Sequence, residues 1–134
     1  MSATDHKAPE LTDLSRVNNT DASAIDPTTW EVLQSFKAIV SEKYGRHLHS
    51  LYLFGSRARG DHRPDSDLDV AVFLDQAPDP IAEQFDLIDR GYDIVLRTGV
   101  NIQPWVFAQT SLRDPIHHRA SHRISTIRRE GIPL

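Results

Sequence analysis

The chain has 134 residues, a formal net charge of −4 and no cysteine, and its length suits one domain with a single modest core. The lack of cysteine excludes disulfides, a thiolate nucleophile and cysteine-ligated metal centres. The sequence has no apolar run of the roughly 18 residues that a membrane helix needs, and its first residues lack the apolar core of a signal peptide, so we expect a cytoplasmic protein without membrane contact.

The N-terminal segment and the first helix differ in pattern. Residues 1–25 are polar and follow neither a helical nor an alternating apolar pattern, which predicts a disordered tail. We expect the folded domain to comprise residues 26–134. Asp26 and Pro27 are typical of a helix N-cap followed by proline at the first helical position, and apolar residues recur at helical spacing until Gly45, the expected end of the helix.

Two strands and a second helix are expected next. Leu48–Phe54 is rich in aromatic and branched residues, and Asp69–Leu74 is a continuous apolar run typical of a strand covered on both faces. Asp79 and Pro80 repeat the capping pattern and open a helix that Gly99 closes. The predicted apolar stripe of this helix consists of Ile81, Phe85, Ile88, Tyr92, Val95 and Leu96.

The last elements are a strand and a basic helix. Val100–Phe107 is a strand candidate in which Pro104 favours an edge position or a bulge. A third capping pair, Asp114 and Pro115, predicts a helix that runs to about Glu130. Its residues expected to face the core are Ile116, Ala120, Ile124 and Ile127. This order of elements predicts an α/β (α+β) fold, a small mixed β-sheet packed against helices.

The segment after the first strand has the composition of a nucleotide site. Gly55 and Ser56 directly follow that strand, and Arg57 and Arg59 add positive charge. Glycine lets the backbone approach a phosphate closely, while backbone N–H groups and a hydroxyl bind its oxygens. The arginines either clamp phosphates or form a solvent-facing basic turn.

Asp67 and Asp69 form the candidate metal site. Residues i and i+2 of a strand point to the same face, so the two carboxylates converge while Leu68 turns into the core. Carboxylates this close repel each other unless a cation lies between them or one takes up a proton. Mg²⁺ suits such oxygen ligands and orients attack on an α-phosphate by a two-ion mechanism. The alternative is a solvated turn that ends in a polar residue at the strand edge.

These residues together resemble a known signature. Gly55-Ser56, ten intervening residues and then Asp67-Leu68-Asp69 are similar to the polymerase-β-like nucleotidyltransferase superfamily, and GSRARGDHRPDSDLDVAV looks like its minimal (MNT) branch. The resemblance implies that fold, contacts of Gly55 and Ser56 with the β- and γ-phosphates, and Mg²⁺ held by Asp67 and Asp69.

The same resemblance implies an activity and a partner. Family members transfer a nucleoside monophosphate to a hydroxyl and release pyrophosphate, and ATP is the expected donor. Many minimal members are MntA-like antitoxins of toxin–antitoxin systems, paired with a HEPN-type toxin that some silence as protein adenylyltransferases. The resemblance therefore implies that a partner protein presents the acceptor hydroxyl.

One position departs from the pattern of that family. Active members carry a third acidic residue on the next strand, and Gln103 stands in its place. A neutral glutamine serves neither as a base nor as an anionic ligand. Asp75 and Asp93 are either substitutes for this acid or ordinary surface residues. Two hypotheses follow: an active nucleotidyltransferase, or a weak or inactive binding module that neutralises its partner by occlusion.

Two features lie outside the motif. Residues 111–134 hold five arginines against two acids, for which a solvated helix face is the expected explanation and a nucleic-acid contact the weaker alternative. Trp30 and Trp105 are expected in the core or an interface rather than as base-stacking platforms.

Overall fold

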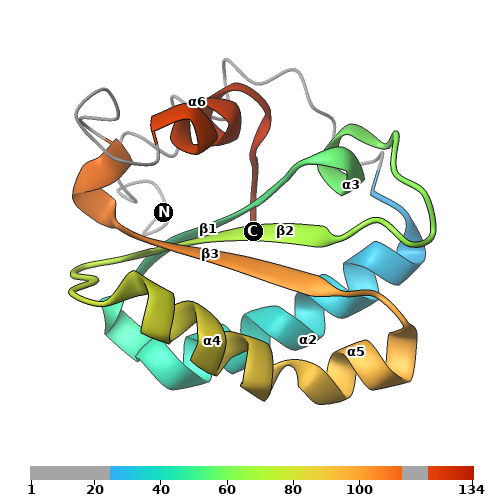
Figure 1. Ribbon diagram of the computed structural model, residues 1–134, viewed down its shortest axis with the longest axis horizontal. Coiled ribbons are helices and arrows are strands. Elements are labelled where there is room, and N and C mark those ends of the chain that lie inside the picture. Colours follow the sequence, from blue (N-terminus) through green and yellow to red (C-terminus); the bar gives the residue numbers. More distant parts are fainter. Residues whose placement is uncertain (1–24, 113–120) are drawn as a thin grey trace, which may run out of the picture.

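The computed structural model describes residues 25–112 and 121–134 and has a four-stranded mixed sheet with helices on both faces (Figure 1). Strand β1 is antiparallel to β2 and β4, whereas β2 and β3 are parallel, and the order is β3-β2-β1-β4. The strands are β1 (Leu48–Phe54), β2 (Leu68–Leu74), β3 (Ile102–Ala108) and β4 (Ile132–Pro133). The predicted small mixed sheet packed against helices is confirmed.

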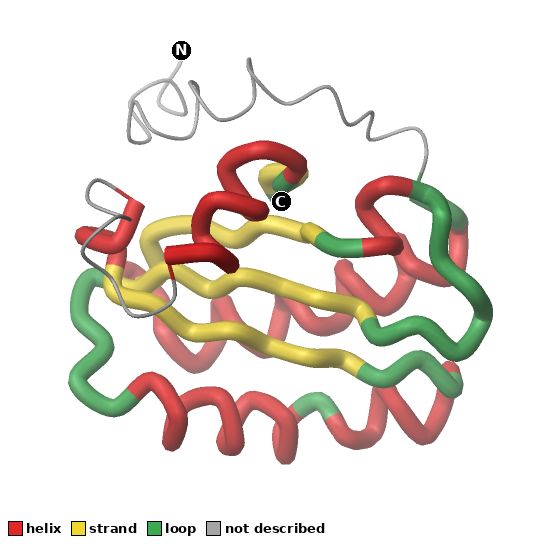
Figure 2. Tube along the Cα trace, turned by 45° about the horizontal axis from the view of Figure 1, so that its top comes forward, coloured by secondary structure: helices red, strands yellow, loops and turns green. Residues whose placement is uncertain are grey.

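The helices divide between the two faces of the sheet (Figure 2). Helices α2 (Pro27–Tyr44), α4 (Pro80–Arg90) and α5 (Tyr92–Thr98) cover one face, and α6 (Ser121–Glu130) lies over the other. Because parallel strands need a crossover connection, α4 and α5 carry the chain from β2 to β3. Short helical turns are η3 (Gly45–His47), α3 (Ser56–Arg59) and η4 (Gln109–Leu112).

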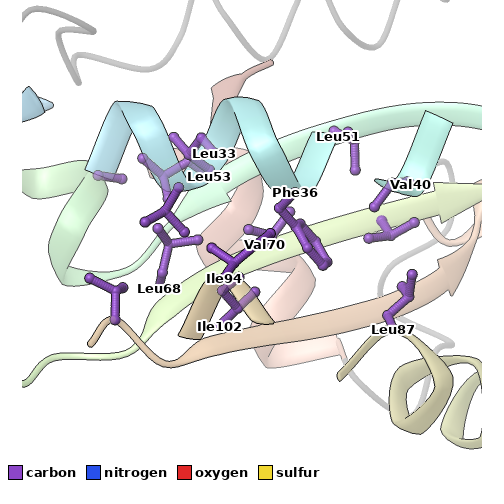
Figure 3. Packing of buried hydrophobic residues seen from close by; sticks show 14 of the residues in the cluster. Leu33, Phe36, Val40, Leu51, Leu53, Leu68, Val70, Leu87, Ile94 and Ile102 are labelled. Atoms are coloured by element: carbon purple, nitrogen blue, oxygen red, sulfur yellow. The ribbon is translucent and has the colours of Figure 1, made fainter. Parts of the chain in front are cut away.

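Each face of the sheet has its own core, because successive strand residues point to opposite faces. The larger core lies under α2, α4 and α5 and includes Leu33, Phe36, Val40, Leu53, Val70, Leu87, Ile94 and Ile102 (Figure 3). The smaller core lies under α6, where Ile124 and Ile127 meet the strand residues Tyr52, Phe54, Ala71, Phe73 and Phe107. The even-numbered and odd-numbered positions of β2 thus serve different layers.

The first predicted helix and its capping residues are confirmed. The Asp26 carboxylate accepts a hydrogen bond from the Thr29 N–H at 2.7 Å, Pro27 opens the helix, and Gly45 ends it with a φ of +55°. Ile25 is only 5% exposed and packs in the larger core. Ile25 thus belongs to the packed structure, whereas residues 1–24 of the predicted disordered tail lie outside the described residues.

The three predicted strands are confirmed within two residues at each end. Strand β3 lies at an edge of the sheet, as Pro104 indicates, because proline has no N–H to donate to a neighbouring strand. The side chain of Gln84 on α4 accepts a hydrogen bond from the Val106 N–H at 3.0 Å. This contact satisfies one donor on the open edge of the sheet.

The helix predicted to end at Gly99 is divided at Gly91, and its predicted buried stripe is wrong. Gly91 packs against the Phe36 ring, where a Cβ would stand 3.5 Å away. Leu87 and Ile94 share the face of this glycine and are the buried residues. Four of the six predicted stripe residues are 55–66% exposed, namely Ile81, Phe85, Tyr92 and Leu96. Leu87 and Ile94, rather than the largest apolar side chains, therefore form the face that packs into the larger core.

The C-terminal elements agree in part with expectation. Ile124 and Ile127 are fully buried as predicted, whereas the expected helix start at Asp114 and the residues Ile116 and Ala120 lie outside the described residues. Strand β4 is a short element that the sequence patterns do not predict. Within the described ranges, no helix is both long and apolar enough to cross a membrane.

Candidate nucleotide and metal site

Asp67 and Asp69 lie where β2 begins, next to the turn that ends β1. The backbone register pairs Asp69 with Phe54 of β1 on one side and with Gln103 of β3 on the other. The predicted convergence of the two carboxylates on one face is consistent with the strand geometry, since Leu68 between them is fully buried in the larger core. The carboxylates therefore belong to the face that α6 covers.

Gly55 brings the phosphate turn against this pair. Its φ is +83°, a conformation that favours glycine, and a Cβ at this position would stand 2.6 Å from the Asp69 Oδ2. Helix α3 starts at Ser56, and the N–H groups of Ala58 and Arg59 bond back to the Gly55 carbonyl. The first N–H groups of such a turn have no acceptor within it and can bind an anion. The motif thus places a possible phosphate contact beside the carboxylates.

Neutral donors hold one oxygen of each carboxylate. The Asn101 Nδ2 donates to the Asp67 Oδ1 at 3.1 Å, and the Trp105 Nε1 donates to the Asp69 Oδ1 at 3.1 Å. Asp67 is exposed, whereas Asp69 is half-buried. Burial raises the pKa of the Asp69 carboxyl; the charge of Asp67 also raises this pKa, while the Trp105 hydrogen bond opposes the increase.

Arg57 has a structural environment. Its side chain is buried, and it donates to the Thr29 hydroxyl at 2.8 Å and to the carbonyls of Pro64 and Ser66 at 3.1 Å each. These bonds fasten the loop before β2 to the start of α2. Arg57 is therefore neither a phosphate clamp nor part of a solvent-facing turn, because its buried guanidinium donates its hydrogen bonds to other parts of the fold.

Arg59 fits the expected phosphate contact better than Arg57 does. It is half-exposed, and it contacts Asp61 at 3.1 Å and Glu130 of α6 at 2.8 Å. The same Glu130 oxygen accepts a bond from the Gly55 N–H at 3.3 Å. Glu130 is a site residue that the motif does not single out. Its signal in the sequence is an acid at the C-terminal end of a basic helix, where the helix dipole disfavours negative charge unless a partner compensates.

Strand β3 supplies no acid to the site. Gln103 occupies the register position opposite Asp69, and its amide donates to the Pro104 carbonyl at 3.1 Å. Asp75 follows the far end of β2 and lies 3.4 Å from His47, and Asp93 is on α5 across the sheet. Neither acid substitutes for the missing one. Among the described residues, no cluster of three or more His, Cys, Asp or Glu side chains is arranged to hold a metal.

Trp105 and Arg123 form a stack beside Asp69. The Arg123 guanidinium carbon lies 3.7 Å from the centroid of the Trp105 ring. Trp105 borders the smaller core, as expected of a core aromatic, but its N–H reaches the site. The sequence gives no local signal for this arrangement, because the three residues come from β2, β3 and α6.

Several known proteins are similar to this chain. Residues 33–130 match the family described as "Nucleotidyltransferase domain". Two proteins of Methanocaldococcus jannaschii named putative protein adenylyltransferases are similar: MJ0141 is 30% identical over 80 residues, which are 60% of this chain and 80% of that protein. MJ1379 is 38% identical over 60 residues, which are 44% of this chain and 58% of that protein.

A solved structure is also similar. The crystal structure of a putative nucleotidyltransferase from Sulfolobus solfataricus superposes with a TM-score of 0.54 at 18% identity, and the match covers 86% of this chain and 88% of that one. At this identity the likeness concerns the fold alone. It supports the predicted arrangement of the sheet and its helices.

Proposed function

Because the chain belongs to the nucleotidyltransferase domain family, we propose that it is a Mg²⁺-dependent enzyme that transfers AMP from ATP to a hydroxyl group of a partner protein. The observation that carries the proposal is the position of Asp67 and Asp69 at the start of β2, directly beside the Gly55-Ser56 turn. The names of the two archaeal relatives support the nucleotide and the class of acceptor.

The two carboxylates fit a divalent cation. In the described part of the chain, the hydrogen bonds of both are made by Oδ1, which leaves Oδ2 of each to a ligand. Carboxylate oxygens are the ligands that Mg²⁺ prefers. A cation here also offsets the repulsion between Asp67 and Asp69 and the burial that raises the pKa of the Asp69 carboxyl. When bound, Mg²⁺ neutralises and orients the triphosphate.

The chain's own residues hold the phosphate end. Gly55 lets the backbone approach the phosphates, and the Ser56 hydroxyl with the first N–H groups of α3 donates to their oxygens. Arg59 is the arginine of the motif that lies near this turn with a half-exposed side chain. No phosphate contact is proposed for Arg57.

In the proposed reaction, the acceptor oxygen forms a bond to the α-phosphorus while the bond from that phosphorus to the bridging α–β oxygen breaks. Pyrophosphate leaves, and the proton of the acceptor hydroxyl passes to water, because the Gln103 amide does not accept it. A missing general base costs about 10²–10⁴-fold in rate. We therefore expect slow transfer rather than none.

The acceptor belongs to a partner in this proposal. The names of the two archaeal relatives, which describe protein adenylyltransferases, support an acceptor on a protein. A HEPN-type toxin, paired with this chain as in MNT toxin–antitoxin systems, is the proposed partner. The acceptor is then one of its hydroxyl side chains.

The test is a transfer assay with ATP labelled at the α-phosphate, Mg²⁺ and the purified product of the neighbouring gene. Mass spectrometry locates the added AMP. We expect Asp67→Asn and Asp69→Asn each to lower transfer by at least about 100-fold. Asp65→Asn is the matched control, because this exposed carboxylate lies in the same loop, and it should retain the wild-type rate.

An acidic variant decides whether the natural sequence is active. Gln103→Asp should raise the rate if the site otherwise functions. No transfer by the wild type together with clear transfer by Gln103→Asp would refute catalysis by the natural chain, and no transfer by either would refute the enzymatic proposal for this partner.

The lack of an acid on β3 favours a second candidate function. A weak or inactive nucleotidyltransferase domain would neutralise its partner by covering it, with or without bound nucleotide. In that case the double variant Asp67→Asn with Asp69→Asn still suppresses the toxin in a growth assay. An enzyme loses this suppression in the same variant.

A further inference from the structure

We propose that Arg123, held on the indole of Trp105, supplies the second positive charge of the nucleotide site, so that this chain uses one divalent cation together with a guanidinium. The inference rests on the proposed function and specifies how the site binds its triphosphate. It concerns the side of the site formed by β3 and α6, which the Gly-Ser and Asp-Leu-Asp motif does not include.

Side chains of β3 and of the residue directly before it already donate to the carboxylates from that side. Asn101 and Trp105 each donate to one Oδ1 at 3.1 Å, and Gln103 lies opposite Asp69 in the register between them. All three are neutral side chains. A second divalent cation would have to compete with the Trp105 N–H for the Asp69 Oδ1 without gaining a new anionic ligand. The arrangement therefore suits one cation bound through the remaining oxygens.

In the described part of the chain, Arg123 is a positive group that lies against this neutral side. Its guanidinium carbon lies 3.7 Å from the Trp105 ring centroid, and the ring is fixed by its bond to Asp69. Ile124 and Ile127 are fully buried and set the rotation of α6 that presents Arg123 to the ring. The side chain is thus held in place from both ends before any ligand binds.

The negative charge of the nucleotide and the two carboxylates requires a positive side chain in addition to one cation. A triphosphate chain and two carboxylates together carry more negative charge than one divalent ion neutralises. Arg59 is paired with Asp61 and Glu130, and Arg57 is buried in the fold. Among the described residues, Arg123 has no carboxylate within ion-pair distance. Its planar fork of donors matches the oxygens of a phosphate.

The experiment counts ions and measures nucleotide affinity in the full chain. Mn²⁺ is titrated into protein with α,β-methylene ATP, which resists cleavage, and free Mn²⁺ is followed by electron paramagnetic resonance. We expect one Mn²⁺ per complex in the wild type and two in Gln103→Asp. Calorimetry should show analogue binding about tenfold weaker in Arg123→Gln. Arg129→Gln removes the same charge from an exposed position of the same helix and should bind within twofold of wild type.

Arg123→Lys keeps the charge but loses the planar fork, so an intermediate affinity is expected. Circular dichroism melts check the fold of each variant; if Arg123→Gln unfolds the chain, Arg123→Lys tests the guanidinium, and the ion count of the wild type tests the single cation. Two Mn²⁺ ions in the wild type, or equal affinities of Arg123→Gln and Arg129→Gln, would overturn the inference and leave the proposed function standing. A wild type that does not bind the analogue would overturn both.

Discussion

At the scale of single residues, Gly55 meets two separate requirements. Its φ of +83° disfavours any side chain, and a Cβ would stand 2.6 Å from the Asp69 Oδ2. We expect Gly55→Ala to lose about 1–3 kcal/mol for the backbone conformation alone, because its φ of +83° and ψ of −161° lie in a region almost restricted to glycine, and more for the displaced carboxylate. Urea denaturation measures the total, and Mn²⁺ titration should show weakened metal binding.

Gly99→Ala is the control for a positive-φ glycine, here in the left-handed region with a ψ of +2°, that has no close neighbour. Gly99 has a φ of +77°, but a Cβ there would meet nothing within 4 Å. This variant should therefore lose only the conformational part and keep its metal affinity. Equal stability losses and unchanged metal binding in both variants would show that Gly55 does not position Asp69.

Asp69 gives a pH-dependent prediction at the same scale. Burial, aided by the charge of Asp67, holds the pKa of the Asp69 carboxyl above its ordinary value in the folded state. Ionisation therefore costs folding free energy as the pH rises from the ordinary carboxyl pKa through the raised one, and the full cost is present above it. Asp69→Asn removes this cost, so its Tm should exceed that of the wild type at neutral pH.

The gain in Tm should vanish in acid, below the ordinary carboxyl pKa, where Asp69 is protonated in both states. Mg²⁺ should raise the Tm of the wild type and leave that of Asp69→Asn nearly unchanged, which links the cost to the metal site. Thermal melts across pH, with and without Mg²⁺, check both points. A wild type more stable than the variant at neutral pH in metal-free buffer would contradict the argument.

At the scale of elements, substitutions in α4 show which of its apolar residues stabilise the fold. Leu87 is fully buried between α4 and the sheet, whereas Phe85 is 66% exposed. Leu87→Ala should cost about 2–5 kcal/mol of unfolding free energy, as expected for a large-to-small change in a core. Phe85→Ala should stay within about 0.5 kcal/mol of wild type. Similar losses of unfolding free energy in both variants would show that the face predicted from the sequence, which includes Phe85, is the buried one.

The elements that were predictable have local causes. The pairs Asp26-Pro27 and Asp79-Pro80 both cap helices as their residue types indicate, and both side chains accept the expected backbone N–H. The buried face of α4 and α5 was not predictable, because it depends on how Leu87 and Ile94 pack against distant parts of the chain in the larger core. Strand β4 depends in the same way on its pairing with Tyr52 and Leu53.

The candidate site also has a part that local sequence predicts and a part that depends on distant contacts. Gly55, Ser56, Asp67 and Asp69 form one short motif, and the residue types alone indicate phosphate and metal chemistry. The contacts that complete the site span the chain: Trp105 reaches Asp69 across 36 positions, and Glu130 reaches Gly55 across 75. These pairings follow from strand register and helix packing, which no local pattern contains.

At the scale of the whole molecule, Glu130 ties the last helix to the phosphate turn. Its buried carboxylate accepts bonds from the Gly55 N–H at 3.3 Å and from Arg59 at 2.8 Å. The C-terminal elements thus help to hold the turn that follows β1. The same carboxylate places a negative charge beside the proposed phosphate position, so stability and nucleotide binding make opposite demands on this residue.

Glu130→Gln should therefore move the two properties in opposite directions. The amide oxygen can still accept from Gly55, but the ion pair with Arg59 is lost, and we expect the unfolding free energy to fall by about 1 kcal/mol because Arg59 is half-exposed. Removal of the repelling charge and release of Arg59 toward the phosphates should tighten nucleotide binding by about fivefold. Glu31→Gln breaks an exposed ion pair with Arg97 on the other face and should change neither property appreciably. Urea denaturation and calorimetry with α,β-methylene ATP measure both, and an affinity that falls together with stability would show that Glu130 only supports the turn.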